Sequence, residues 1–84
     1  DMFEKITVIE PVNVPDHMRR EISSRGKEIV YYNDLPQDNA DIISRIGNAD
    51  CVLLSYTSSL DREVLEHCPN VSYIGLFSTL YEAK

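Results

Sequence analysis

Four short apolar runs, rich in β-branched residues, alternate along the chain with stretches of helical length. The predicted strands are Lys5–Ile9, Glu28–Tyr32, Cys51–Leu54 and Val71–Ile74. Runs of this length and composition are typical of buried β-strands. Strands that alternate with helices pair in parallel through right-handed crossovers, so this order restricts the chain to the α/β class.

The stretch between the first two strands has the pattern of an amphipathic helix. Val14, Met18 and Ile22 recur every fourth residue and form one apolar stripe. Pro15 suits the first turn of such a helix, where its missing N–H is no loss. Gly26 stands where a left-handed C-terminal cap is expected.

Two further helices are predicted. One covers about Asp38 to Ile46 and ends at Gly47-Asn48, and the other runs from an N-cap at Ser59 to about His67. The apolar residues expected on their inner faces are Ile42, Ile43 and Ile46 in the first and Leu60, Val64, Leu65 and Cys68 in the second. Pro69 ends the last helix, and the residues from Gly75 to Lys84 are expected to form a loop.

The resulting order, βαβαβαβ, predicts a flavodoxin-like parallel sheet of strand order 2-1-3-4 with helices on both faces. Ligands of open α/β sheets bind beyond the carboxyl ends of the strands, at the point where the strand order reverses. The loops that would lie there are residues 10–13, 33–37, 55–59 and 76–81. The loop Ser55–Ser59 carries five hydroxyls, which suit either a carboxylate or phosphate site or merely a capped helix and a polar loop.

Charge and cysteine usage exclude several classes of function. The net charge of −6, with scattered basic residues, argues against nucleic acid and acidic membrane surfaces as partners. No apolar run is long enough to span a membrane. Cys51 and Cys68 lack the spacing of metal ligands and are expected to pack as small hydrophobes, in a reducing, cytoplasmic setting.

No catalytic group is predicted from these residues. His67 and Cys68 are adjacent on a helix, so their side chains point about 100° apart and do not face each other. The chain contains neither a G-x-G-x-x-G sequence nor a P-loop, so no residue is predicted to bind a nucleotide cofactor.

Two segments nevertheless resemble a known enzyme family. Ala49–Leu54 followed by Leu60–Gly75 is similar, in order and spacing, to the first domain of the D-isomer-specific 2-hydroxyacid dehydrogenases. That domain typically contains Ala-Asp-Val before two apolar residues, then a polar loop, a Glu-Val-Leu-Glu helix, a proline and an Ile-Gly strand end. The resemblance implies an α/β substrate-binding domain, of which residues 1–84 form the N-terminal part.

The resemblance also implies which loops would hold a substrate. The family usually has an arginine after the third strand and a glycine-rich loop after the fourth, whereas this chain has Ser55 and the segment Leu76–Tyr81 there. Backbone N–H groups around Phe77 to Thr79 could still hold a carboxylate beside Tyr56. The substrate-binding residues implied are therefore Ser55, Tyr56, Phe77, Ser78 and Thr79.

The family's dinucleotide fingerprint and its catalytic Arg, Glu and His all follow the first domain. The resemblance thus implies an intact, homodimeric enzyme that uses NAD or NADP to interconvert a 2-hydroxy acid and a 2-keto acid. The 84 residues alone are expected to be an incomplete domain that binds no cofactor, is inactive and self-associates through exposed apolar surface. The alternatives are a stand-alone binding module and a phospho-receiver domain, although strand three ends in Leu54-Ser55 without the receiver's aspartate.

Overall fold

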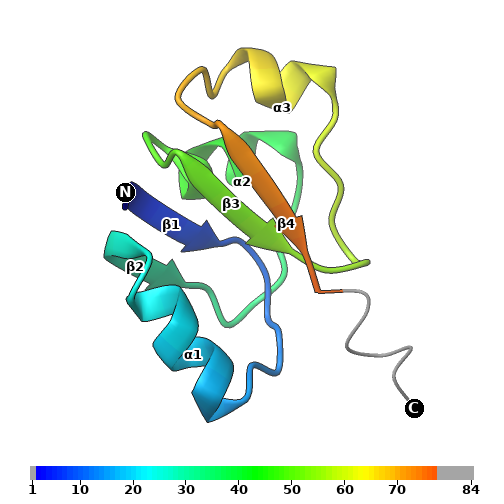
Figure 1. Cartoon of the computed structure of the whole chain (residues 1–84). Coiled ribbons are helices and arrows are strands. Elements are labelled where there is room, and N and C mark those ends of the chain that lie inside the picture. The colour runs from blue at the N-terminus through cyan, green and yellow to red at the C-terminus, as the bar shows by residue number, and fades with distance from the viewer. Residues whose placement is uncertain (1, 78–84) are drawn as a thin grey trace.

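The computed structural model describes residues 2–77, which form an α/β fold around one parallel sheet (Figure 1). The elements in chain order are β1 (Phe3–Val8), α1 (Asp16–Ser23), β2 (Gly26–Tyr31), α2 (Asn39–Ile46), β3 (Cys51–Leu54), α3 (Arg62–Glu66) and β4 (Tyr73–Leu76). The strand order is β2-β1-β3-β4, and every pair is parallel. The predicted fold class and sheet order are therefore confirmed.

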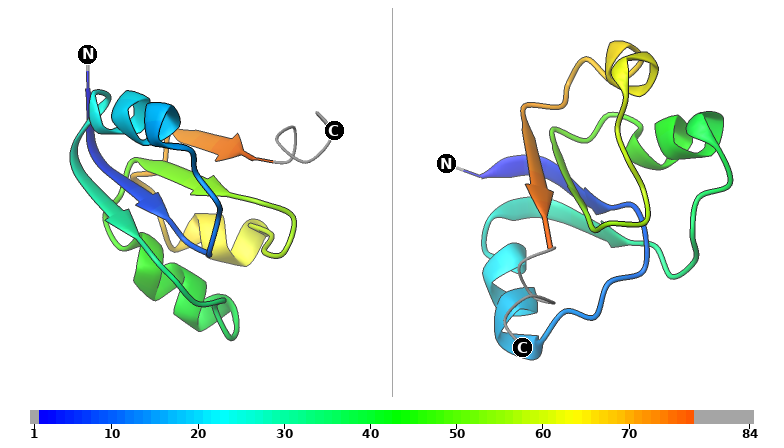
Figure 2. Two further views of the ribbon diagram at one scale, coloured as in Figure 1. Left: turned by 90° about the horizontal axis from the view of Figure 1, so that it is seen from below. Right: turned by 90° about the vertical axis from the view of Figure 1, so that its right-hand side faces the viewer.

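The helices cover both faces of the sheet, as Figure 2 shows: α1 lies on one face, and α2 and α3 lie on the other. The larger apolar cluster lies under α2 and α3 and consists of Ile9, Ile42, Ile46, Ala49, Val52, Leu54, Val64 and Cys68. The smaller cluster lies under α1, where Val8, Val14 and Phe77 are buried. Because both faces of the sheet are covered near β3, this strand is apolar along its whole length, without alternation.

On the α1 face, the helix leaves part of the sheet uncovered. An open groove of about 240 Å³ lies between α1 and β4, with Met18, Ile22 and Leu53 among its lining residues. Beside it, the edge strand β4 exposes Tyr73 and Leu76, whose exposed fractions are 53% and 63%. Within residues 2–77 no helix is long and apolar enough to cross a membrane.

The boundaries of three strands differ from the predicted ones by one or two residues. β1 starts at Phe3 because the N–H of Phe3 donates to the carbonyl of Arg25 (2.8 Å), which also brings Gly26 into β2. β4 starts only at Tyr73. The preceding residue, Ser72, belongs to the turn that leads into the sheet, and its N–H donates to the carbonyl of Asp50 (2.8 Å). The hydrogen bonds that fix these ends join residues far apart in sequence.

The prediction that Gly26 caps a helix was wrong. Ser24 occupies the C-cap of α1 in a right-handed helical conformation, and Gly26 is a buried residue of β2. A Cβ on Gly26 would lie 2.7 Å from Cδ1 of Ile6, so the glycine allows close packing across the sheet. Gly47 does end α2 as predicted, with a φ of 54° that favours glycine.

The third helix is shorter than predicted and has a different cap. Asp61, and not Ser59, is its N-cap: the Asp61 carboxylate accepts from the N–H of Val64 at 3.1 Å. Leu65, which was expected on the inner face, is 37% exposed, while Val64 and Cys68 are buried. A five-residue helix buries a narrower stripe than the longer helix, from the Ser59 cap to about His67, that the sequence suggested.

Asp50 joins three strands at the amino edge of the sheet. Its carboxylate accepts from the backbone N–H groups of Glu4 and Lys5, both at 3.0 Å, and its carbonyl accepts from Ser72 and Tyr73 at the start of β4. The hydrogen bonds from Lys5 and then Glu4 hold the pKa of the Asp50 carboxyl below its usual value. The ionised carboxylate is therefore the form that the folded state favours.

Replacing Asp50 with asparagine is expected to lower the urea midpoint near neutral pH, because the amide has one acceptor oxygen and its NH2 group opposes a backbone N–H. Since the folded-state pKa of Asp50 is lowered, its stabilising effect is complete above the unfolded pKa of about 3.9 and is lost as the pH falls through the lower folded value. The difference in midpoint between the two proteins should therefore narrow below about pH 4. Glu66→Gln, at an exposed position of α3, is the control. A difference in urea midpoint between the wild type and Asp50→Asn that stays the same at all pH values would contradict this account.

Candidate functional site

The carboxyl ends of β1 and β3 lie side by side at the point where the strand order reverses (Figure 1). The N–H of Ile9 donates to the carbonyl of Leu53 at 3.1 Å and keeps the two ends together. Glu10 and Ser55 follow directly, each at the start of a connection that leads to a helix. In open α/β sheets this crevice is the usual ligand position.

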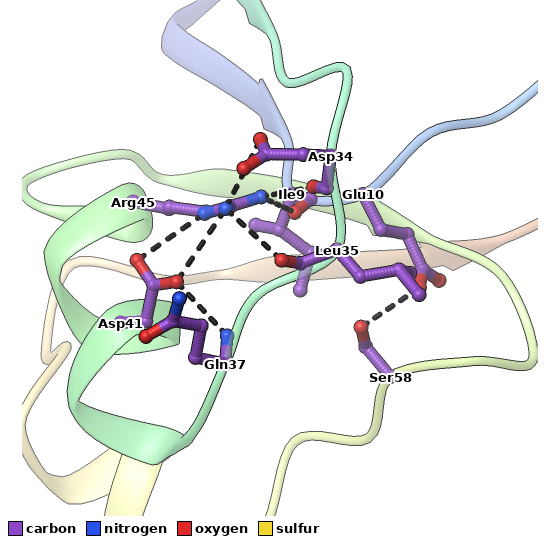
Figure 3. Close-up of polar contacts among 8 residues, drawn as sticks. All are labelled: Ile9, Glu10, Asp34, Leu35, Gln37, Asp41, Arg45 and Ser58. Atoms are coloured by element: carbon purple, nitrogen blue, oxygen red, sulfur yellow. Dashed lines mark hydrogen bonds and ion pairs between the residues drawn. The ribbon is translucent and has the colours of Figure 1, made fainter.

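Glu10 places a buried carboxylate in this crevice. Its side chain is fully buried, and its two oxygens accept from the backbone N–H of Ser55 and from the hydroxyl of Ser58, the latter at 2.7 Å (Figure 3). A buried carboxylate without such partners would be strongly unfavourable. The pairing therefore ties the end of β1 to the connection between β3 and α3.

Arg45 places a buried positive charge on the other side of the same strand end. Its side chain, 6% exposed, leaves α2, and its Nη1 donates to the carbonyls of Ile9 (2.8 Å) and Asp34 (2.5 Å). Nη2 contacts the Asp34 carboxylate at 3.2 Å (Figure 3). The guanidinium also stacks over the ring of Tyr32, 4.6 Å from its centroid. Arg45 thus ties the end of β1 to the connection between β2 and α2.

Asp41 completes this arrangement at the first turn of α2. Its carboxylate accepts from the N–H of Gln37 at 2.9 Å and lies 3.4 Å from Nε of Arg45. The Gln37 N–H, and after it the charge of Arg45, hold the pKa of the Asp41 carboxyl below its usual value. Within residues 2–77 the guanidinium of Arg45 contacts the connection between β2 and α2, the end of β1 and Asp41, so it has a structural role at this edge.

Two of the predicted substrate-binding residues lie after β3, on the loop that Glu10 holds. Ser55 is buried, with 5% of its surface exposed, and its N–H is bonded to Glu10. Its neighbour Tyr56 is 61% exposed and extends from the same loop. The backbone N–H of Ser55 is thus used internally, whereas the surface of the loop is formed by its exposed side chains.

The other predicted residues follow β4. Phe77 is buried with Val8 and Val14 under α1, and its N–H donates to the carbonyl of Leu54 at 3.0 Å. Ser78 and Thr79 lie outside the described residues. That these five residues contact a substrate stays a prediction, and the N–H of Phe77 is already occupied by the sheet.

The burial of Glu10 and Arg45 was missed from the sequence. Glu10 was placed only in a loop, and Arg45 lies among isoleucines without interrupting their helical spacing. The one local signal is that Arg45 follows Asp41 by four residues, a spacing that places both side chains on one face of a helix. Nothing local indicates that a charge points toward the sheet.

The cysteines and histidines form no reactive centre within residues 2–77. Cys51 and Cys68 are buried free thiols, and burial raises the pKa of the Cys51 thiol to about 11. His67 ends α3, where Nδ1 lies 2.8 Å from the carbonyl of Glu63. In this part of the chain no three His, Cys, Asp or Glu side chains are grouped so as to hold a metal ion.

Comparison with known proteins identifies a family whose model matches nearly the whole chain. Residues 6–82 match the family described as D-isomer specific 2-hydroxyacid dehydrogenase, catalytic domain. The chain is also 37% identical over 79 residues to a hydroxypyruvate reductase of Blautia hydrogenotrophica, an alignment that covers 92% of this chain and 24% of that protein. The chain therefore spans about a quarter of the length of this relative. The match over nearly all of the sequence shows that the chain belongs to the D-isomer specific 2-hydroxyacid dehydrogenase family, in its catalytic domain.

Proposed function

We propose that this chain is the N-terminal part of the substrate-binding domain of an NAD- or NADP-dependent oxidoreductase that interconverts a D-2-hydroxy acid and a 2-keto acid. The observation that carries the proposal is the family match over residues 6–82. The similarity to a hydroxypyruvate reductase supports a small 2-keto acid, such as hydroxypyruvate, as the substrate.

In this proposal the substrate contacts the two loops that follow β3 and β4. The residues assigned to it are Ser55, Tyr56, Phe77, Ser78 and Thr79. The support is the position of Ser55, Tyr56 and Phe77 after the carboxyl ends of the neighbouring parallel strands β3 and β4, where ligands of such sheets bind. Among the described residues, Tyr56 supplies the exposed surface, because the N–H groups of Ser55 and Phe77 are bonded internally and the side chains of both residues are buried.

The residues present do not fit the dinucleotide. A pyrophosphate needs a glycine-rich turn between a strand and the start of a helix. None of Gly26, Gly47 and Gly75 lies in a strand-to-helix connection. The connection after β1 instead places the buried carboxylate of Glu10 at its start, which opposes a phosphate group. In this proposal the cofactor is therefore bound by another part of the intact enzyme, and no step of the reaction is assigned to it here.

The proposal extends to assembly and compartment. The intact enzyme is proposed to be a homodimer of the cytoplasm, and the free thiols of Cys51 and Cys68 are compatible with its reducing conditions. The 84-residue chain alone is proposed to self-associate through the apolar edge at β4, where Tyr73, Ile74 and Leu76 are exposed.

The test compares the intact gene product with the 84-residue chain. We expect the intact protein to oxidise NADH or NADPH in the presence of 2-keto acids such as hydroxypyruvate and glyoxylate, whereas the 84 residues show no turnover. Oxidation of D- but not L-glycerate in the reverse direction would establish the stereochemistry. An intact protein that is inactive toward a panel of 2-keto acids, or turnover by the 84 residues alone, would overturn the proposal.

A further inference from the structure

The loop after β3 is fixed from a distant part of the chain. The seven residues between β3 and α3 belong to no strand or helix, so regular backbone pairing does not determine where they lie. Ser55 and Ser58, two residues of this loop, both donate to the Glu10 carboxylate, which is 45 and 48 positions away in sequence. Figure 3 shows the Glu10 side chain extending from the end of β1 toward Ser58.

The position of Glu10 is itself determined by its neighbour. The carbonyl of Ile9 accepts from Arg45 and its N–H donates to Leu53, so the backbone before Glu10 is held from both sides. The Glu10 side chain therefore extends from a backbone segment that is hydrogen-bonded to both α2 and β3. A charged group that is anchored in this way can hold a loop within a few tenths of an ångström, as the placement of substrate-contacting groups requires.

The energetics argue against a role in stability alone. Burying a carboxylate is costly, and well-packed apolar replacements of buried charges are often neutral or stabilising. What an apolar side chain could not supply are the two directional acceptors that orient the Ser55 N–H and the Ser58 hydroxyl. The benefit that the carboxylate brings is thus the conformation of the loop.

We infer that Glu10 is a positioning residue for the substrate: without touching it, the Glu10 carboxylate fixes the loop Ser55–Ser59 in the conformation that binds the 2-keto acid. This inference rests on the proposed function. It separates two kinds of residue on the edge of the sheet, since Tyr56 would contact the substrate whereas Glu10 acts through Ser55 and Ser58.

The test uses the intact gene product with the variants Glu10→Gln, Glu10→Asp and Ser58→Ala. Glu10→Gln keeps the size of the side chain but removes the charge and one of the two acceptors. We expect it to raise KM for the 2-keto acid on the order of tenfold, the effect of losing one charge-assisted hydrogen bond, with kcat and KM for the cofactor nearly unchanged. Ser58→Ala should give a smaller increase in KM, and Glu10→Asp should restore part of the loss. Glu28→Gln, at an exposed position of β2, is the matched control.

Hydrogen exchange of the same proteins supplies a readout that does not depend on activity. In Glu10→Gln, faster exchange should be confined to the peptide that contains Ser55–Ser59, while α2 keeps its protection. An unchanged KM and unchanged exchange would overturn the inference. A fall in kcat accompanied by faster exchange throughout the domain would also overturn it, since it would indicate a merely structural role.

The two proposals can fail separately. If the intact wild-type protein has no activity toward 2-keto acids, the proposed function fails, and with it the role toward substrate. Local exchange in Glu10→Gln would then decide whether the carboxylate holds the loop at all. If the wild type is active and the variant keeps its KM, only the inference about Glu10 fails.

Discussion

Replacement of Arg45 by alanine is expected to destabilise the domain by about 3–5 kcal/mol, the usual cost of breaking a buried charged network by removing one partner. The variant loses the donors to the carbonyls of Ile9 and Asp34 and leaves the Ile9 carbonyl buried without its partner. The stability of small domains is of similar size, so much of the variant protein should be unfolded. Urea unfolding followed by far-ultraviolet circular dichroism measures the loss.

Two control variants separate the loss of the hydrogen bonds of Arg45 from the loss of its positive charge. Arg45→Lys keeps the positive charge but cannot reach several carbonyls at once, so most of the destabilisation should remain. Arg25→Ala removes an exposed arginine paired with Glu21 and should cost at most about 1 kcal/mol. If Arg45→Ala and Arg25→Ala had similar effects, the buried contacts of Arg45 would contribute little to stability.

Ile46→Ala is expected to cost about 2–5 kcal/mol, the range for truncating a fully buried isoleucine. Ile46 lies at the end of α2, where none of its surface is exposed and its side chain packs in the cluster under α2 and α3. The truncation removes three carbon atoms from this cluster and leaves a cavity that the short helix can only partly close. The same urea titration measures the effect.

The matched control for this prediction lies on the same helix. Ile43 is only partly buried at the margin of the cluster, so Ile43→Ala should cost clearly less than Ile46→Ala. Both substitutions change helix propensity in the same way, and the difference between them therefore reports burial. Equal losses at the two positions would mean that the cluster is not packed as the structure indicates.

The sequence was sufficient to predict the features that depend on local pattern. Cys51–Leu54 was predicted with the observed bounds because a continuous apolar run between Asp50 and Ser55 has clear ends. The apolar spacing in α2 identified Ile42 and Ile46 as buried, and the alternation of strands and helices predicted the sheet order. These features depend on residues that lie close to one another in the sequence.

What could not be predicted depends on residues far apart in sequence. The register of β4 is set by the carbonyl of Asp50, and the burial of Glu10 depends on donors that arrive 45 residues later. Gly26 was predicted to cap a helix because a glycine follows the helical pattern. Its actual role, close contact with Ile6, depends on a strand pairing that the local sequence does not show. Likewise, Ser59 was predicted as the N-cap of the third helix, whereas Asp61 caps it in the structure, where its carboxylate also accepts from Asn39 of α2.

The bonds of Asp50 have a consequence for how quickly this protein reaches its native state. Every strand pair is parallel, so none of them can close as a local hairpin, and β1 must find β3 across more than forty intervening residues. Folding rates fall as native contacts become more distant in sequence. The hydrogen bonds from Glu4 and Lys5 to the Asp50 carboxylate lie where β1 is aligned with β3 in the native sheet. Folding should therefore be slower than in a helical protein of the same length, and mutations at Asp50 should act on the folding rate as well as on the unfolding rate.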